Sequence, residues 1–134
     1  MTVTLEHRLL WSYASEKLGD AVRILTLHPA TLRGRLCACT QLLAMVPANA
    51  LPPLLARRYA DIWAVLIRRV DAEGTPSVVL SLRGLRETTL VRLAEEICRL
   101  NAETEKLAEG ADAGESRHRV RGSTRKNERP KLQR

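Results

Sequence analysis

Arg23 and His28 are the two residues of this chain whose types and spacing could do chemistry together. They stand in the stretch RILTLHP, separated by four residues, and Pro29 follows the histidine directly. An imidazole can move protons and a guanidinium can stabilise phosphate charge, so the pair could cleave RNA without a metal ion. On a continuous helix, however, five positions turn the two side chains about 140° apart. They share a face only if the helix ends between them.

Pro29 favours a helix end at this point, because proline disfavours helical backbone at the residue before it. We therefore interpret Arg23 as a cation near a helix C-terminus and His28 as a residue beside that end. As an alternative, the spacing resembles the arginine and histidine motif of the HEPN ribonucleases, although Ile24 stands where that family usually has a polar residue. This resemblance implies a metal-independent ribonuclease of the toxin or defence type, with Arg23 and His28 acting across a dimer.

The three cysteines do not have the spacing of a metal site or of a disulfide framework. Cys37 and Cys39 would point about 200° apart on a helix and so would not bind one ion together. Cys98 is far along the chain, and no second pair supplies the four ligands of a structural zinc. We therefore expect buried or half-buried thiols, no metal and no cofactor, in a reducing cytoplasmic setting. Glycine-rich phosphate loops and the GxSxG and HExxH motifs are also missing.

Apolar residues at helical spacing predict an all-α fold, a compact four-helix bundle over residues 1–110. With two Trp, two Tyr and no Phe, aliphatic side chains must supply most of the buried area. The first helix is expected over residues 4–26, with Gly19 weakening its middle. Its expected buried side comprises Leu5, Leu9, Tyr13, Leu18, Val22 and Leu25.

Proline, threonine and glycine mark the expected bounds of the other helices. The second helix is expected over residues 30–46, and the third runs from a first turn at Pro52 and Pro53 to Val70, capped by Asn49. The last helix is expected from a cap at Thr88 or Thr89 to Gly110. On its exposed side, opposite charges four residues apart predict two ion pairs: Arg92 with Glu96 and Glu95 with Arg99.

Residues 77–82, SVVLSL, leave two structures open. They alternate apolar and polar residues as a strand does, yet six residues with no second strand nearby cannot make a sheet. We expect an extended or short helical connector. A strand here would instead place a ribbon before a helix, which makes a small DNA-binding regulator a further alternative.

Residues 36–56 have the length of a membrane span, because they hold no charged residue over 21 positions. Pro47, Pro52 and Pro53 would break a helix through them, and arginines flank both ends equally. We therefore expect two core helices joined by a proline turn, and no membrane span. The N-terminus also lacks the pattern of a secretory signal.

The net charge of +7 is concentrated in the last 24 residues. Residues 1–110 hold 14 Lys and Arg against 12 Asp and Glu, whereas residues 111–134 hold eight against three. This tail has few large hydrophobic residues and is expected to be disordered in isolation, either as a solubilising end or as a non-specific RNA or DNA contact. It has no aromatic residue, so binding would depend on salt more than on sequence. The expected phosphate contacts are Arg117, Arg119, Arg121, Arg125, Lys126, Arg129, Lys131 and Arg134.

The order of LPPLLARRYADIW and TPSVVLSLRGLRETTLVRLAEEICRL is similar to a pattern in short bacterial all-helical proteins. The shared positions are core positions, so the resemblance implies a helical bundle in a bacterial cytosol and no particular activity. We predict a non-enzymatic binding module, an accessory or regulatory subunit that contacts a protein partner. Trp11 and Trp63 are the candidate partner contacts. The apolar rhythm of the last helix also allows a homodimer.

Overall fold

The structure is a computed structural model that describes the backbone of residues 4–132 and the side chains of residues 4–110. Within this range the chain is helical and contains no β-strand, only an isolated bridge between Val70 and Pro76. The predicted all-α class and the helical bundle are thereby confirmed. The elements are α1 (Leu5–Leu27), α2 (Leu32–Leu43), the 3-10 helix η1 (Ala48–Ala50), α3 (Pro53–Leu66), α4 (Val78–Arg83) and α5 (Glu87–Leu132).

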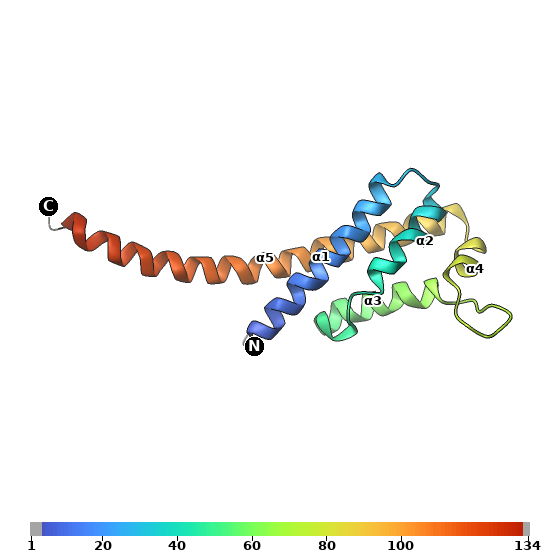
Figure 1. The fold of residues 1–134 in the computed structure, drawn as a ribbon, viewed down its shortest axis with the longest axis horizontal. Helices are drawn as coiled ribbons and strands as arrows, with labels where there is room; N and C mark the ends of the chain where they lie inside the picture. Colours follow the sequence, from blue (N-terminus) through green and yellow to red (C-terminus); the bar gives the residue numbers. More distant parts are fainter. Residues whose placement is uncertain (1–3, 133–134) are drawn as a thin grey trace.

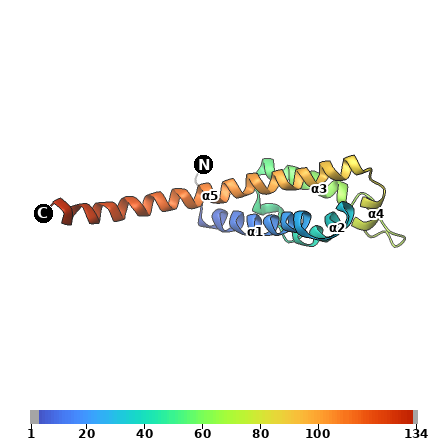
Figure 2. The same ribbon diagram turned by 90° about the horizontal axis from the view of Figure 1, so that it is seen from above.

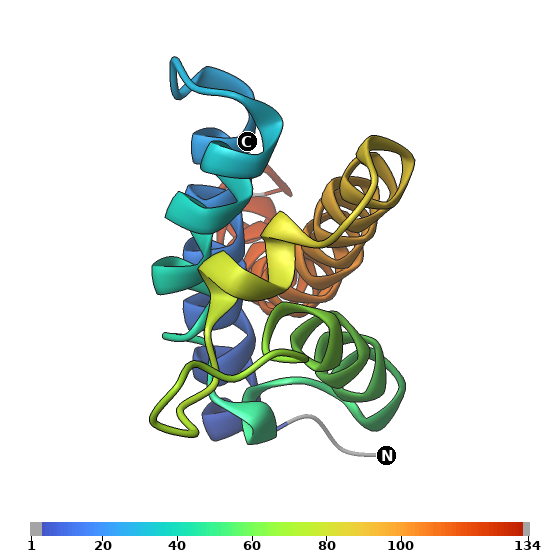
Figure 3. The same cartoon turned by 90° about the vertical axis from the view of Figure 1, so that its right-hand side faces the viewer.

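Four long helices form the bundle, and the short α4 crosses one end of it (Figure 1). α1 packs mainly against α5 and α2, and α3 packs against the first part of α5. Seen from the α4 end, α1 and α2 lie on one side of the bundle and α3 and α5 on the other (Figure 3). α5 continues alone past the body of the bundle (Figure 2).

The buried side of α1 differs from the predicted one. Leu5 and Leu9 are 63% and 62% exposed and Tyr13 is exposed as well, so their assignment to the core was wrong. At about 100° per residue Leu5 and Leu9 lie on the side of the helix opposite to the buried row, and Tyr13 lies on its flank. Two alanines in that row let neighbouring helices approach closely, which a search for large apolar residues does not detect. The buried row comprises Ala14, Leu18, Ala21 and Leu25.

The other bounds follow from local capping, with several corrections. α2 begins after Thr31, whose hydroxyl accepts a hydrogen bond from the Gly34 N–H, and it ends three residues before the predicted end at residue 46. α3 ends at Leu66, four residues before the predicted end at Val70, and Val70 is exposed. Asn49 lies in η1 and does not cap α3, which begins after Pro52 without a side-chain cap. α5 begins at Glu87, so Thr88 and Thr89 are inside its first turn.

Residues 78–83 form α4, so the helical connector is confirmed and the ribbon of the DNA-binding alternative does not form. The hydroxyl of Ser77 caps α4 by accepting the Leu80 N–H. The buried hydroxyl of Ser81 donates to the Ser77 carbonyl and accepts the Arg69 N–H at 2.9 Å. These bonds fix α4 to the chain that leaves α3.

The backbone of residues 111–132 continues α5. The last helix was predicted to end at Gly110, whereas α5 continues to Leu132. The phosphate contacts of the eight basic side chains lie outside the described side chains and stay predictions.

Gly19→Ala is expected to raise the free energy of unfolding by about 0.5–1 kcal/mol. Gly19 lies inside α1, and a Cβ there would meet its nearest neighbour, Asn101 Oδ1, at an ordinary 3.9 Å. The methyl group would therefore fit while the unfolded chain loses conformational freedom. Urea unfolding measures the gain. Gly74→Ala is the matched control: its φ of +82° disfavours a side chain, so this variant should lose stability. A loss in both variants would contradict the open space beside Gly19.

Candidate functional site

Arg23 and His28 lie on the outer surface of the bundle near the end of α1. The Arg23 side chain is 72% exposed, and its Nη1 is 3.9 Å from Asp20 Oδ1. His28 is exposed and ends the helix, with its N–H donating to the Ile24 carbonyl. Within the described chain, no hydrogen bond or ion pair joins Arg23 to His28. This geometry is that of the predicted helix end, and action across a dimer stays a prediction.

The cysteines are free thiols, buried or half-buried as predicted. Burial, with smaller contributions from the nearby Cys37 and Cys98, raises the pKa of Cys39 to about 12. Burial also raises the pKa of Cys98, and Glu95 adds to this shift. A raised pKa keeps a thiol protonated and weakens it as a nucleophile and as a metal ligand. The described residues contain no group of three His, Cys, Asp or Glu side chains placed to hold a metal ion.

The two tryptophans are half-buried against neighbouring rings. Trp63 meets the edge of Tyr59 with ring centroids 6.3 Å apart, and Trp11 stacks on His7 at 6.0 Å. The Tyr59 hydroxyl in turn donates to carbonyls at the end of α2. Each ring therefore keeps part of its surface open, and the role of the tryptophans as partner contacts stays a prediction.

A groove of about 220 Å³ lies between α3 and α5. Apolar side chains form its floor, and two acidic and two basic side chains stand along its rim. Sequence reasoning missed the groove, because it is lined by residues about 30 positions apart on two helices. The floor comprises Ile62, Val65 and Leu93, and the charged rim comprises Arg58, Asp61, Arg92 and Glu96.

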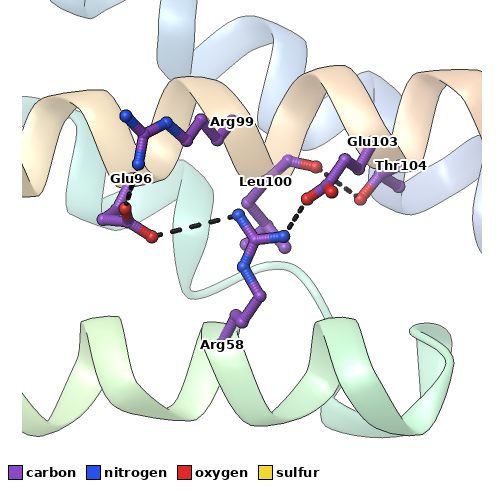
Figure 4. A network of polar contacts seen from close by, with 6 residues as sticks. All are labelled: Arg58, Glu96, Arg99, Leu100, Glu103 and Thr104. Atoms are coloured by element: carbon purple, nitrogen blue, oxygen red, sulfur yellow. Dashed lines mark hydrogen bonds and ion pairs between the residues drawn. The ribbon is translucent and has the colours of Figure 1, made fainter.

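Arg58 connects the two walls of this groove (Figure 4). From α3 it pairs with Glu103 of α5 and lies 3.9 Å from Glu96, which also holds Arg99 at 2.8 Å. Both ion pairs predicted within the last helix were therefore wrong for the described side chains. Glu96 is held by Arg58 and Arg99 instead of Arg92, and Arg99 binds Glu96 instead of Glu95. Only the fold brings Arg58 to these carboxylates, since 45 positions separate it from Glu103.

Two arginines of α2 bind the carbonyl groups at the ends of other helices. Arg33 donates from Nε to the Leu82 carbonyl at 3.1 Å and from Nη2 to the Leu85 carbonyl at 3.0 Å. Arg35 donates from Nη1 to the Leu25 carbonyl at 2.6 Å. A cation is favourable at these helix C-termini, so part of the body's positive charge has a structural role.

No helix in residues 4–132 combines the length and the apolarity that crossing a membrane requires. Comparison of the chain with protein-family models, with curated proteins and with solved structures gives no match.

Proposed function

We propose that this chain is a non-enzymatic accessory or regulatory subunit whose helical body contacts a protein partner and whose basic C-terminal segment contacts nucleic acid. The observation that carries the proposal is the separation of charge along the chain. Eight of the 22 Lys and Arg stand in residues 111–134, while the preceding 110 residues are close to neutral. The backbone of α5 extends this segment past the body (Figures 1 and 2).

A segment of this kind suits the phosphate backbone of RNA or DNA. Phosphates attract Lys and Arg without regard to base sequence, and release of counterions makes the affinity fall steeply with salt. The segment contains no aromatic residue on which a base could stack. The contact therefore supplies attachment and leaves sequence recognition to another subunit.

The groove between α3 and α5 supports the contact with a protein. Its apolar floor suits the apolar side of an amphipathic helix from the partner, the arrangement in which a helix lies in a hydrophobic groove. Exposed Asp61 and Arg92 place opposite charges on its two walls, so a helix that carries both charges beside its apolar face would be complementary. A second copy of the chain is the alternative occupant.

The nucleic-acid contact is tested by removing charge from the segment in the full chain. Arg125, Lys126 and Arg129 are replaced by Gln, and binding of a labelled duplex is followed by fluorescence anisotropy over a series of salt concentrations. We expect weaker binding. We also expect the slope of log affinity against log salt concentration to be smaller in magnitude by about 3. The matched control removes three exposed cations of the body, Arg23, Arg57 and Lys106, and should bind as the parent chain does.

Equal affinity and equal salt dependence in the tail variant would overturn the proposed contact. The ribonuclease alternative is separated by incubating the full chain with single-stranded RNA in EDTA, where we expect the RNA to stay intact. Cleavage that is lost on His28→Ala would instead establish a metal-independent nuclease.

A further inference from the structure

Two arginines from distant parts of the chain are held against the turn between α4 and α5. Arg33 binds the carbonyls of Leu82 and Leu85, and its Nη1 has no acceptor among the described residues. The Arg69 guanidinium lies over Gly84, since a Cβ at Gly84 would be 3.0 Å from its central carbon. The Arg33 guanidinium, held by two hydrogen bonds, therefore loses little conformational freedom when it binds an anion.

Arg83 and Arg86 bring two more guanidinium groups to the same turn, and we name the four residues Arg33, Arg69, Arg83 and Arg86 the α4 arginine cluster. Arg83 ends α4 and shares with Arg33 the lining of a depression of about 340 Å³ between α2 and α4. Arg86 directly precedes α5 and is exposed, as is Arg83. A count of charge along the chain does not reveal the cluster, because these arginines are scattered in the sequence.

The cluster has no carboxylate partner in the described part of the chain, where no ion pair involves any of its members. Glu87, next to Arg86, is exposed and is the one carboxylate in residues 77–87. Of the nearby loop acids, Asp71 accepts the N–H groups of Glu73 and Thr75, and Glu73 is exposed. Four arginines thus stand in or near this turn against one carboxylate in residues 77–87 and two in the neighbouring loop, an excess of positive charge that attracts phosphates.

The cluster and the basic segment lie at opposite ends of α5 (Figures 1 and 2). Arg117, the first cation of the segment, follows Glu87 by 30 positions, which is about 45 Å along a helix. Between them, residues 95–115 hold seven Asp and Glu against two Lys and Arg. This acidic stretch repels a duplex that lies along α5. The two basic regions are therefore suited to separate duplexes.

We infer that the α4 arginine cluster is a second phosphate-binding surface and that one chain joins two nucleic-acid duplexes. The cluster grips the backbone of one duplex, and the C-terminal segment holds the other. The joining of two duplexes rests on the proposed function of that segment, whereas binding at the cluster does not.

The test uses Arg83→Gln with Arg86→Gln in the full chain, because neither side chain has a hydrogen-bond or ion-pair partner among the described residues. Energy transfer between donor-labelled and acceptor-labelled DNA duplexes reports their joining, and anisotropy reports binding of one duplex. We expect the double variant to lose energy transfer. For binding of one duplex, the slope of log affinity against log salt concentration should be smaller in magnitude by about 2. Replacing the same two residues by Lys should restore energy transfer.

The double variant Arg57→Gln with Lys106→Gln removes equal charge elsewhere and should behave as the parent chain does. Unchanged energy transfer and unchanged binding in the Arg83 and Arg86 variant would overturn the inference. If the Arg83 and Arg86 variant binds one duplex more weakly but keeps its energy transfer, the claim that one chain joins two duplexes is overturned. The cluster would then remain a binding surface for one duplex. If the variant with Gln at Arg125, Lys126 and Arg129 binds a duplex as the parent chain does, while the Arg83 and Arg86 variant binds it more weakly, the proposed function of the segment fails and binding at the cluster stands.

Discussion

Leu18→Ala is expected to lower the free energy of unfolding by about 2–5 kcal/mol. Leu18 is fully buried on the side of α1 that packs against the bundle, so the shorter side chain removes apolar contacts and leaves a cavity. For a small helical protein this is a large fraction of the total stability. Chemical denaturation followed by circular dichroism measures the loss.

Leu9→Ala is the matched control on the same helix. Leu9 is 62% exposed, so its truncation should change the free energy of unfolding by no more than about 0.5 kcal/mol. The amphipathic pattern of the sequence placed Leu9 and Leu18 together in the core, whereas the structure separates them. Similar losses in the two variants would contradict the orientation of α1 described above.

Raising the pH from 9 to about 11 is expected to lower the free energy of unfolding of the parent chain. The loss should be about 2 kcal/mol larger than the loss in the Cys39→Ala variant over the same range. Burial raises the pKa of Cys39 from 9.0 to about 12, so in this range the unfolded chain releases a proton that the folded chain keeps. The stabilisation is fully present below pH 9 and is lost as the pH rises towards 12. Cys39→Ala has no thiol at this position and lacks this loss.

The measurement compares urea unfolding of the two proteins at several pH values. Burial also raises the pKa of Tyr59 and of Cys98, but both groups are present in both proteins, so the effect of their burial cancels in the difference. The cavity left by Cys39→Ala shifts the variant by a constant amount and leaves the slope unaffected. A difference in stability that does not change between pH 9 and 11 would show that Cys39 is not buried as described.

Local signals were sufficient to predict where most helices lie. Pro29 and Pro53 mark the end of α1 and the start of α3 because proline restricts its own backbone and that of the preceding residue. The choice of buried side failed on α1, because Ala14 and Ala21 are less conspicuous in a sequence than Leu5 and Leu9. Small residues become core residues only when a neighbouring helix comes close, and that neighbour is set by the whole fold.

The candidate sites depend still more on tertiary structure. The Arg58 to Glu103 pair and the Arg33 to Leu82 hydrogen bond join residues 45 and 49 positions apart. No periodicity within one segment identifies such partners. The charge of the C-terminal segment, by contrast, is a local property of the chain, and the sequence alone predicted a role for it.

The neighbouring arginines of α2 have a consequence for how the bundle opens. Arg33 and Arg35 stand two positions apart, yet the first holds the end of α4 and the second holds the end of α1. α2 cannot detach without releasing both ends. Amide hydrogens in the last turns of α1 and α4 should therefore exchange with solvent in one shared opening event, at the same free energy as those of α2, instead of fraying separately.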